Sequence, residues 1–269
     1  MTEPIQLLPK ARYGPPLPSR LPIAKLLCLR PNSVALVQSS SRGCTSCGAQ
    51  RFCMPKGLTE GDALDFEGMV SHGLKVKKGH ALFHAPQRLI SLYAVRVGAF
   101  KTTIVDHGGR GQITGFQMPG EMLGLDAIAD GAHTCSAVAL EDSEVCVMPY
   151  ASLQRACTKC PTLQSNFNRL LSQLLIRDQQ MMLLMGNLNA EQRLSTFLLS
   201  LSERYRLRGY SPSSFILRMS REDISGYLGL RLETVCRAIA QLREREIIEC
   251  HGRTLNIIDV ARLNAATES

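Results

Sequence analysis

The sequence predicts an α+β fold in which a β-rich region is followed by one long helix and then by a helical region that ends in a β-hairpin. Three observations predict it. Between residues 58 and 156, short apolar stretches alternate with glycine turns, as in a barrel or sandwich of short strands. Between residues 161 and 188, apolar side chains recur every three or four residues, as on a helix. From residue 189 on, helix-capping residues precede apolar segments, and two short strand-like segments follow.

Composition divides the chain into four segments. Residues 1–43 are rich in proline and keep no apolar period, so we expect a flexible N-terminal arm. Residues 44–160 hold a cysteine-bearing loop and the β-domain, residues 161–188 the long helix, and residues 189–269 the C-terminal domain. The expected strands are Leu74–Val76, Ala81–His84, Ser91–Val97, Phe100–Val105, Gln112–Phe116, Ser136–Leu140 and Glu144–Met148.

Charge and hydropathy exclude some classes of protein. The longest stretch without a charged residue or histidine, Gln179–Ala190, is too short to cross a bilayer, and no apolar signal segment opens the chain. We therefore expect a cytoplasmic protein with no membrane partner. The net charge is +8, and every basic residue after position 160 is arginine. Arginine suits phosphate and base edges, although an arginine-rich codon preference has the same effect. No Walker, HExxH or GxSxG motif is present, so we expect no enzyme.

The C-terminal domain contains the spacing of a helix-turn-helix. Ser220 begins a capping box before a short helix, Gly229 supplies a turn, and Leu232–Arg245 forms a second helix before a hairpin. Glutamate can accept from cytosine N4, and arginine can bind guanine O6 and N7 in the major groove. An amphipathic surface helix is the alternative. The exposed polar residues expected at the start of the second helix are Arg231, Glu233, Thr234 and Arg237.

Two stretches carry a resemblance to a known family. Asp223–Ala238 resembles the DNA-binding signature of the CRP/FNR superfamily of bacterial transcription regulators. Gln112–Phe116, followed by Gly120-Glu121 and Gly124–Ile128, is similar to the FNR branch. The resemblance covers about residues 44–262. It implies a jelly-roll-like β-roll sensor domain, a dimerisation helix and a winged helix-turn-helix that binds double-stranded DNA.

The resemblance also implies functional roles. Glu233, Cys236 and Arg237 lie where the base-reading residues of the family lie, and the implied half-site resembles TTGAT. The FNR branch usually has a serine in place of Cys236, and a thiol is a poorer hydrogen-bond donor than a hydroxyl. The resemblance further implies contact with RNA polymerase, for which the Asp106–Arg110 turn is one candidate surface.

The cysteines point to metal or redox chemistry, because ten are present in a chain without a secretory signal. Cys44, Cys47 and Cys53 can face one centre from a single loop. Resemblance to FNR-type oxygen sensors implies Cys146 as the fourth ligand and a [4Fe–4S] cluster as the cofactor. Cys135 and Cys28 are alternative fourth ligands. Structural zinc, a thiol switch and an iron–sulfur electron-transfer protein remain alternatives.

Two further expectations concern the β-domain and the long helix. The cyclic-nucleotide branch of the superfamily has an arginine before a Ser-Ala or Thr-Ala dipeptide, and here Cys135 precedes Ser136-Ala137, so we expect no cyclic nucleotide. The long helix is expected to form a homodimer seam in which Asp178 meets its own counterpart, so that repulsion makes the dimer switchable. The seam residues are Leu171, Leu174, Asp178, Met181 and Met185.

Overall fold

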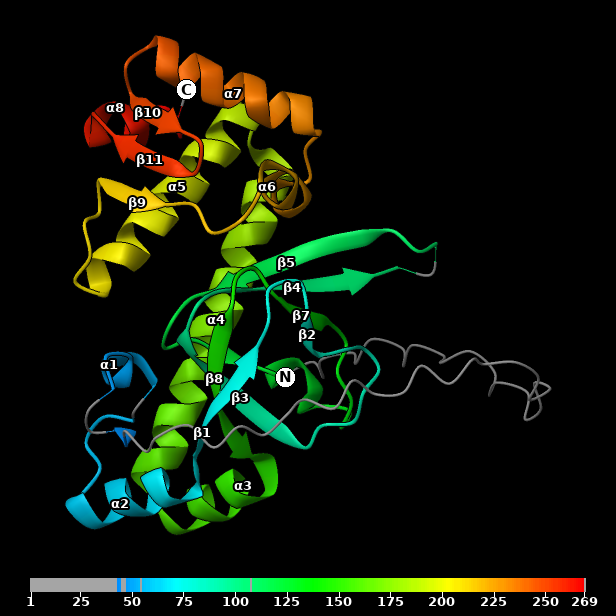
Figure 1. Cartoon of the computed structure of the whole chain (residues 1–269), viewed down its shortest axis with the longest axis vertical. Helices are drawn as coiled ribbons and strands as arrows, with labels where there is room; N and C mark the ends of the chain where they lie inside the picture. The colour runs from blue at the N-terminus through cyan, green and yellow to red at the C-terminus, as the bar shows by residue number, and fades with distance from the viewer. Residues whose placement is uncertain (1–42, 45–46, 54, 107, 269) are drawn as a thin grey trace, which may run out of the picture. The chain divides into compact units, whose positions relative to one another are not determined.

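The computed structural model describes residues 43–44, 47–53, 55–106 and 108–268. The expected N-terminal arm, apart from Gly43, lies outside the described residues. The rest of the chain has the predicted α+β fold: a β-roll, one long helix and a C-terminal helical domain with a small sheet (Figure 1).

Two four-stranded antiparallel sheets form the β-roll. Their strand orders are β1-β8-β3-β6 and β2-β7-β4-β5, and Phe83, Val95, Phe100 and Val145 form part of the core between them. All seven expected strands are present. β6 was not expected, because two apolar residues show no alternation. The strands are β1 (Ser71–Val76), β2 (Ala81–Phe83), β3 (Ser91–Val97), β4 (Phe100–Val105), β5 (Gly111–Gln117), β6 (Met122–Leu123), β7 (Ser136–Ala139) and β8 (Ser143–Pro149), and a 3-10 turn lies at Leu125–Ala127.

A second apolar cluster lies on the other side of β3 and β8. There Leu92 and Met148 pack against Phe66 of α2 (Glu60–Met69) and Leu153 of α3 (Tyr150–Lys159). The short helix α1 (Gln50–Cys53) belongs to the cysteine-bearing loop. The sequence did not predict α2, because Phe66 is its single fully buried side chain and no apolar stripe marks it.

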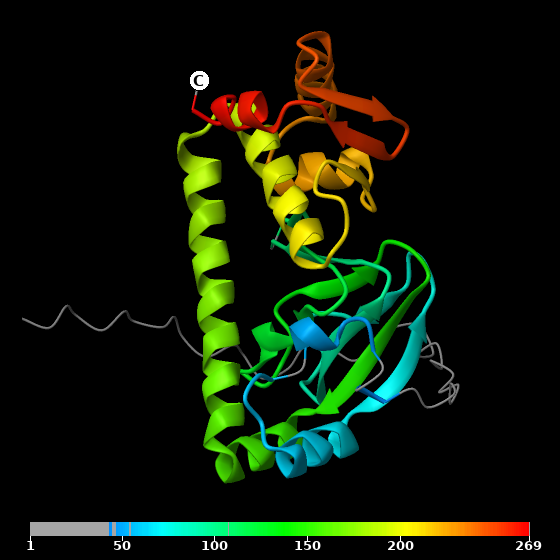
Figure 2. The same cartoon turned by 90° about the vertical axis from the view of Figure 1, so that its left-hand side faces the viewer.

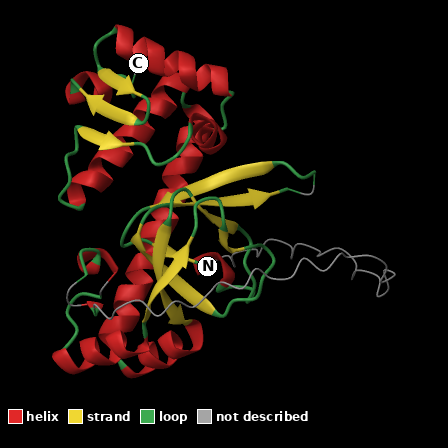
Figure 3. Ribbon diagram, viewed as in Figure 1, coloured by secondary structure: helices red, strands yellow, loops and turns green. Residues whose placement is uncertain are grey.

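The long helix α4 (Pro161–Asn187) is continuous over 27 residues (Figure 2). The C-terminal domain follows with α5 (Ala190–Leu207), β9 (Ser214–Ile216), α6 (Arg221–Leu228), α7 (Leu232–Glu244), β10 (Ile248–His251), β11 (Thr254–Ile257) and α8 (Val260–Ala265). The predicted hairpin is β10–β11, and β9 joins it as a third antiparallel strand. Figure 3 shows that helices dominate from α3 onward. None of the described helices is long and apolar enough to cross a membrane.

Candidate functional site

Local hydrogen bonds build the helix-turn-helix. The Ser220 hydroxyl accepts from the Asp223 amide at 3.0 Å, and the Asp223 carboxylate accepts from the Ser220 amide at 2.9 Å. This capping box starts α6. Gly229 ends α6 in the left-handed region, at φ 62°, which side chains disfavour and which lets the chain turn into α7. Leu228 and Val235 are fully buried at the contact between the two helices. The predicted cap and turn are confirmed.

The start of α7 forms the candidate recognition face. Glu233, Cys236 and Arg237 are exposed, as is Arg231, while Thr234 is half-buried. Within the part of the chain that the structure describes, the side chains of Arg231, Glu233 and Arg237 form no hydrogen bond or ion pair. These charges are therefore available to an external partner.

The wing of the domain is tied to α6. The Arg221 guanidinium donates to the Cys250 sulfur at 2.7 Å and to the Gly252 carbonyl at 3.3 Å. The contact joins the start of α6 to the turn between β10 and β11. Cys250 is buried in the core of this domain, so its role is structural.

The cysteine-bearing loop is held against α2. The Cys44 amide donates to the Glu67 carboxylate at 2.8 Å, and the Cys47 amide donates to the Cys44 carbonyl at 3.1 Å. Cys53 ends α1, where its thiol donates to the Ala49 carbonyl at 3.4 Å. The described part of the loop, residues 43–44 and 47–53, thus carries three cysteines on one short segment.

Cys146 comes to this loop from β8, where it pairs with Ala94 of β3. Cys53 and Cys146 pack in the same apolar cluster, together with Phe66. Burial is the main cause that raises the pKa of Cys53 to about 12, followed by the neighbouring Cys47, Cys146 and Cys44. Burial, then Cys44 and Cys47, raises the pKa of Cys146 to about 12. All four predicted cysteines are thus brought within electrostatic reach of one another.

The donor set suits an iron–sulfur cluster, since four thiols in an apolar surrounding are its usual ligands. Among the described residues, no three His, Cys, Asp or Glu side chains are gathered closely enough to hold a single metal ion. A [4Fe–4S] cluster binds its thiolates on separate iron atoms, so its ligands stand farther apart than those of one zinc ion. Cys135 packs in the interior of the β-roll, in a different cluster from Cys146. Cys28 lies outside the described residues.

One charged residue beside the cysteines was missed in the sequence. Arg96 of β3 forms an ion pair with Glu144 of β8 at 2.6 Å, and the two side chains are only 14% and 19% exposed. Burial raises the pKa of Cys44 and Cys146, and the Arg96 charge opposes that rise. A lone arginine in a strand gives no sequence signal, because its neighbour on β8 is set by sheet pairing.

Comparison with known proteins identifies the family. Residues 192–266 match the Crp-like helix-turn-helix domain, and residues 74–160 match the cyclic nucleotide-binding domain. The chain is 42% identical to the transcriptional regulatory protein btr of Bordetella pertussis over 82% of this chain and 91% of that protein. It is 38% identical to the anaerobic regulatory protein of Pasteurella multocida over 82% and 81% of the two chains.

The chain belongs to the CRP/FNR family of transcription regulators. The structure of FixK2 from Bradyrhizobium japonicum is similar, with a TM-score of 0.68 and 29% identity over 73% of this chain and 96% of that one. The relatives are regulators and not enzymes, as the lack of enzyme motifs predicts.

In this CRP/FNR regulator, a carboxylate lies beside Cys135 in the β-roll. The Asp126 carboxylate accepts from the amides of Thr134 at 2.7 Å and Cys135 at 3.2 Å, and its other oxygen lies 3.3 Å from His133. Burial and then Asp126 raise the pKa of the Cys135 thiol to about 12. Asp126 therefore lies beside Cys135, the residue that precedes the Ser136-Ala137 dipeptide.

The long helix of this CRP/FNR regulator has two apolar sides. Of the predicted seam, Met181 and Met185 pack against the core of their own chain, Leu171 and Leu174 are half-buried, and Asp178 is exposed. The exposed large apolar side chains of α4 are Leu175, Ile176, Met182 and Leu183. Leu171, Leu175, Asp178 and Met182 follow the spacing of a coiled-coil stripe. On this exposed stripe Asp178 lies between Leu175 and Met182, whereas the sequence predicted Leu174 and Met181 as its neighbours.

Proposed function

We propose that this DNA-binding transcription regulator responds to oxygen through a [4Fe–4S] cluster held by Cys44, Cys47, Cys53 and Cys146. The observation that carries the proposal is the meeting of Cys146 with the cysteine-bearing loop, because Cys146 shares an apolar cluster with Cys53. Anaerobic regulation in the name of a relative supports it. When bound, the cluster supplies oxygen-labile bonds between the loop and β8.

The alternatives fit less well. The thiol of a redox switch is partly exposed and lies in an electropositive surrounding, whereas Cys44 and Cys146 are buried. Structural zinc favours paired C-x2-C knuckles, and the spacing here is two and then five residues. Electron transfer does not require the exposed and unpaired charged side chains at the start of α7.

DNA reading is assigned to the start of α7. We propose that Glu233 and Arg237 contact base edges, with Cys236 beside them, and that Arg231 and Thr234 lie near the backbone of a half-site like TTGAT. A palindromic site requires a homodimer, and the exposed stripe of α4 supplies an apolar face for it. The two copies of Asp178 would then meet and oppose dimerisation until the cluster is bound.

Two further proposals concern RNA polymerase and cyclic nucleotides as partners of the β-roll. We propose that the hairpin of β4 and β5, which extends from the sandwich in Figure 1, contacts RNA polymerase. Asp106 shapes its turn by accepting from the amides of Gly108 at 2.8 Å and Arg110 at 2.9 Å, and Val105 is 59% exposed. The β-roll binds no cyclic nucleotide, because Asp126 would repel the phosphate. We propose that the protein acts in the cytoplasm, where it would meet these partners.

The test is anaerobic purification of the full chain, with iron, sulfide and zinc analysis, followed by DNA binding under nitrogen and in air. We expect a brown protein with iron and sulfide in equal amounts that binds a palindrome under nitrogen and loses it in air. A colourless protein that contains zinc and binds the palindrome equally in air would contradict the oxygen-sensing proposal and leave DNA binding intact.

A further inference from the structure

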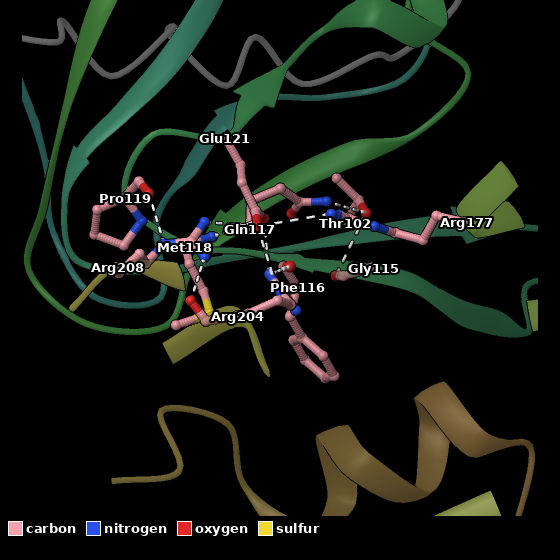
Figure 4. Close-up of polar contacts among 10 residues, drawn as sticks. All are labelled: Thr102, Gly115, Phe116, Gln117, Met118, Pro119, Glu121, Arg177, Arg204 and Arg208. Carbon is pink, nitrogen blue, oxygen red and sulfur yellow. Dashed lines mark hydrogen bonds and ion pairs between the residues drawn. The ribbon is translucent and has the colours of Figure 1, made fainter. Parts of the chain in front are cut away.

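The carboxylate of Glu121, in the turn between β5 and β6, is the centre of a buried ion-pair network (Figure 4). Its side chain is 14% exposed. It accepts from Arg204 at 2.7 and 3.1 Å and from Arg208 at 2.8 Å, and Arg177 lies 3.8 Å away. Burial alone would raise the pKa of Glu121, but Arg204, Arg177 and Arg208 lower it below its usual range, so the carboxylate is charged at neutral pH.

The network joins three parts of the molecule. Glu121 belongs to the β-roll, Arg177 to α4, and Arg204 to α5 of the DNA-binding domain. The two arginines near the end of α5 also bind the backbone of the same turn: Arg204 donates to the Phe116 carbonyl at 2.6 Å and Arg208 to the Pro119 carbonyl at 2.9 Å. Each guanidinium thus binds the carboxylate and a carbonyl together from one planar group, a fixed geometry that the single nitrogen of a lysine does not provide.

Aromatic rings pack beside the network. The ring of Phe116 lies 6.0 Å from that of Phe197 on α5 and 5.1 Å from that of Tyr227 on α6, measured between ring centres. A charge pair in such a surrounding is screened less than one on the surface. Losing one partner also leaves a buried charge unpaired.

The opposite end of α5 is held to α4. Arg193 donates to the carbonyls of Met185 and Leu188, both at 2.8 Å, and to that of Leu228 at 3.1 Å. From Arg193 to the Glu121 contacts the helix spans about 20 Å.

The Glu121 contacts hold α5 at the end far from the joint between α4 and α5, in addition to the packing of Phe116 on Phe197. The ion pairs Lys101–Asp223 and Arg218–Glu141 join the β-roll to parts of the DNA-binding domain outside α5. Losing the Glu121 contacts would therefore leave α5 freer to move about the joint. Because α7 packs on α5, its direction follows that of α5.

We propose that Glu121 is a positioning residue for DNA recognition, which fixes α5, and with it the recognition helix α7, relative to the β-roll and α4. A palindrome requires two recognition helices at a fixed spacing and orientation. Freedom at the joint would have to be lost again on binding, which weakens affinity for the palindrome. Random DNA needs no such alignment and would be affected little. The inference rests on the proposed DNA binding and adds how the recognition helix is oriented.

The experiment replaces Glu121 by glutamine, which keeps the shape and removes the charge. We expect Glu121→Gln to bind the palindrome roughly tenfold more weakly than the wild type under nitrogen, with iron content, dimer fraction and binding to scrambled DNA nearly unchanged. The matched control is Glu203→Gln. Glu203 pairs with Arg206 on the same helix, but both side chains are more than half exposed. That variant should bind both DNAs like the wild type.

A second variant keeps the test decisive if Glu121→Gln folds poorly. Arg208→Lys retains the charge but loses the planar guanidinium that contacts the Glu121 carboxylate and the Pro119 carbonyl together. It should therefore also lower the preference for the palindrome. The double variant should then be no worse than the more affected single variant, since both disturb one interaction. Unchanged binding, tighter binding, or equal losses on palindrome and scrambled DNA would each overturn the inference. A wild type without preference for the palindrome would instead overturn the proposed function.

Discussion

The cysteine site and the recognition helix differ in burial and in how many segments of the chain contribute to them. The cysteines come from two distant segments, Cys44 and Cys146 are buried, and burial raises the pKa of their thiols. The recognition residues come from one short segment, and Glu233 and Arg237 are exposed and unpaired within the described residues. On the proposed function, the recognition face is therefore preformed, while the cysteine site is completed only when its thiols lose protons and bind the cluster.

This difference predicts different responses to substitution. A site whose ligands surround one cofactor should lose that cofactor when a single ligand is removed, because all the ligands are needed to bind it. A preformed face should lose affinity one contact at a time, by about 1–3 kcal/mol for each good base contact. Four substitutions test the two sites and the helix α4 that joins them, and we give them from the largest expected effect to the smallest.

Cys146→Ala should give the largest effect, the loss of the cluster and of specific DNA binding. In the proposed site Cys146 is the ligand from β8, and alanine offers none. The measurement is iron and sulfide content with the visible spectrum under nitrogen. Cys135→Ala is the matched control, because Cys135 lies in a different apolar cluster and its loss should keep the colour. A Cys146→Ala protein that retains a full four-iron cluster would contradict the assignment of Cys146 as a ligand.

Asp178→Ala should give a dimer that forms in air without iron. Asp178 is exposed on α4 beside Leu175 and Met182, and like charges meeting there repel by on the order of 1–4 kcal/mol. Asp178→Asn should go partway, since it removes the charge but leaves a polar group to bury. Light scattering after size exclusion, in air, measures the dimer fraction. Equal monomer fractions for wild type and Asp178→Ala would show that this carboxylate is simply solvated.

Arg237→Ala should cost about 1–3 kcal/mol at the cognate palindrome and little at random DNA. Arg237 is exposed on the first half of α7 and pairs with no other described residue. Arg243→Ala is the control, because Arg243 is exposed in the last turn of the same helix. Binding titrations at one salt concentration measure both. Equal losses of Arg237→Ala on both DNAs would make Arg237 a phosphate contact only.

The contrast between the two sites also governs what the sequence could predict. The capping box at Ser220 and the turn at Gly229 are local, so the helix-turn-helix was predicted with its bounds. The spacing of Cys44, Cys47 and Cys53 is local too, whereas Cys146 was found through family resemblance alone. Its contact with Cys53 depends on how β8 packs, and no local pattern encodes that.

Long-range contacts explain the other differences. Glu121 binds Arg204 and Arg208, which lie more than 80 positions away in the sequence, so the motif Gly120-Glu121 suggested a resemblance but no ion pair. On α4, a period of three and four residues fits two stripes that share Leu171 and Asp178. Only packing shows that Met181 faces its own chain while Met182 is exposed.

Arg96→Gln should give the smallest effect, a cluster that assembles but is lost about two- to tenfold faster in air. Arg96 pairs with Glu144 beside Cys146, and its charge offsets part of the negative charge that four thiolates would bring. Glutamine leaves Glu144 half-buried without its partner and removes that compensation. Lys77→Gln is the control, since Lys77 forms an ion pair with Asp142 in which the two side chains are 76% and 63% exposed, and such pairs contribute little. The rate is followed by visible absorbance after mixing with air-saturated buffer. If Arg96→Gln and Lys77→Gln lose colour at the wild-type rate, the Arg96–Glu144 pair only stabilises the sheet, and the cysteine site depends on its thiols and apolar surroundings alone.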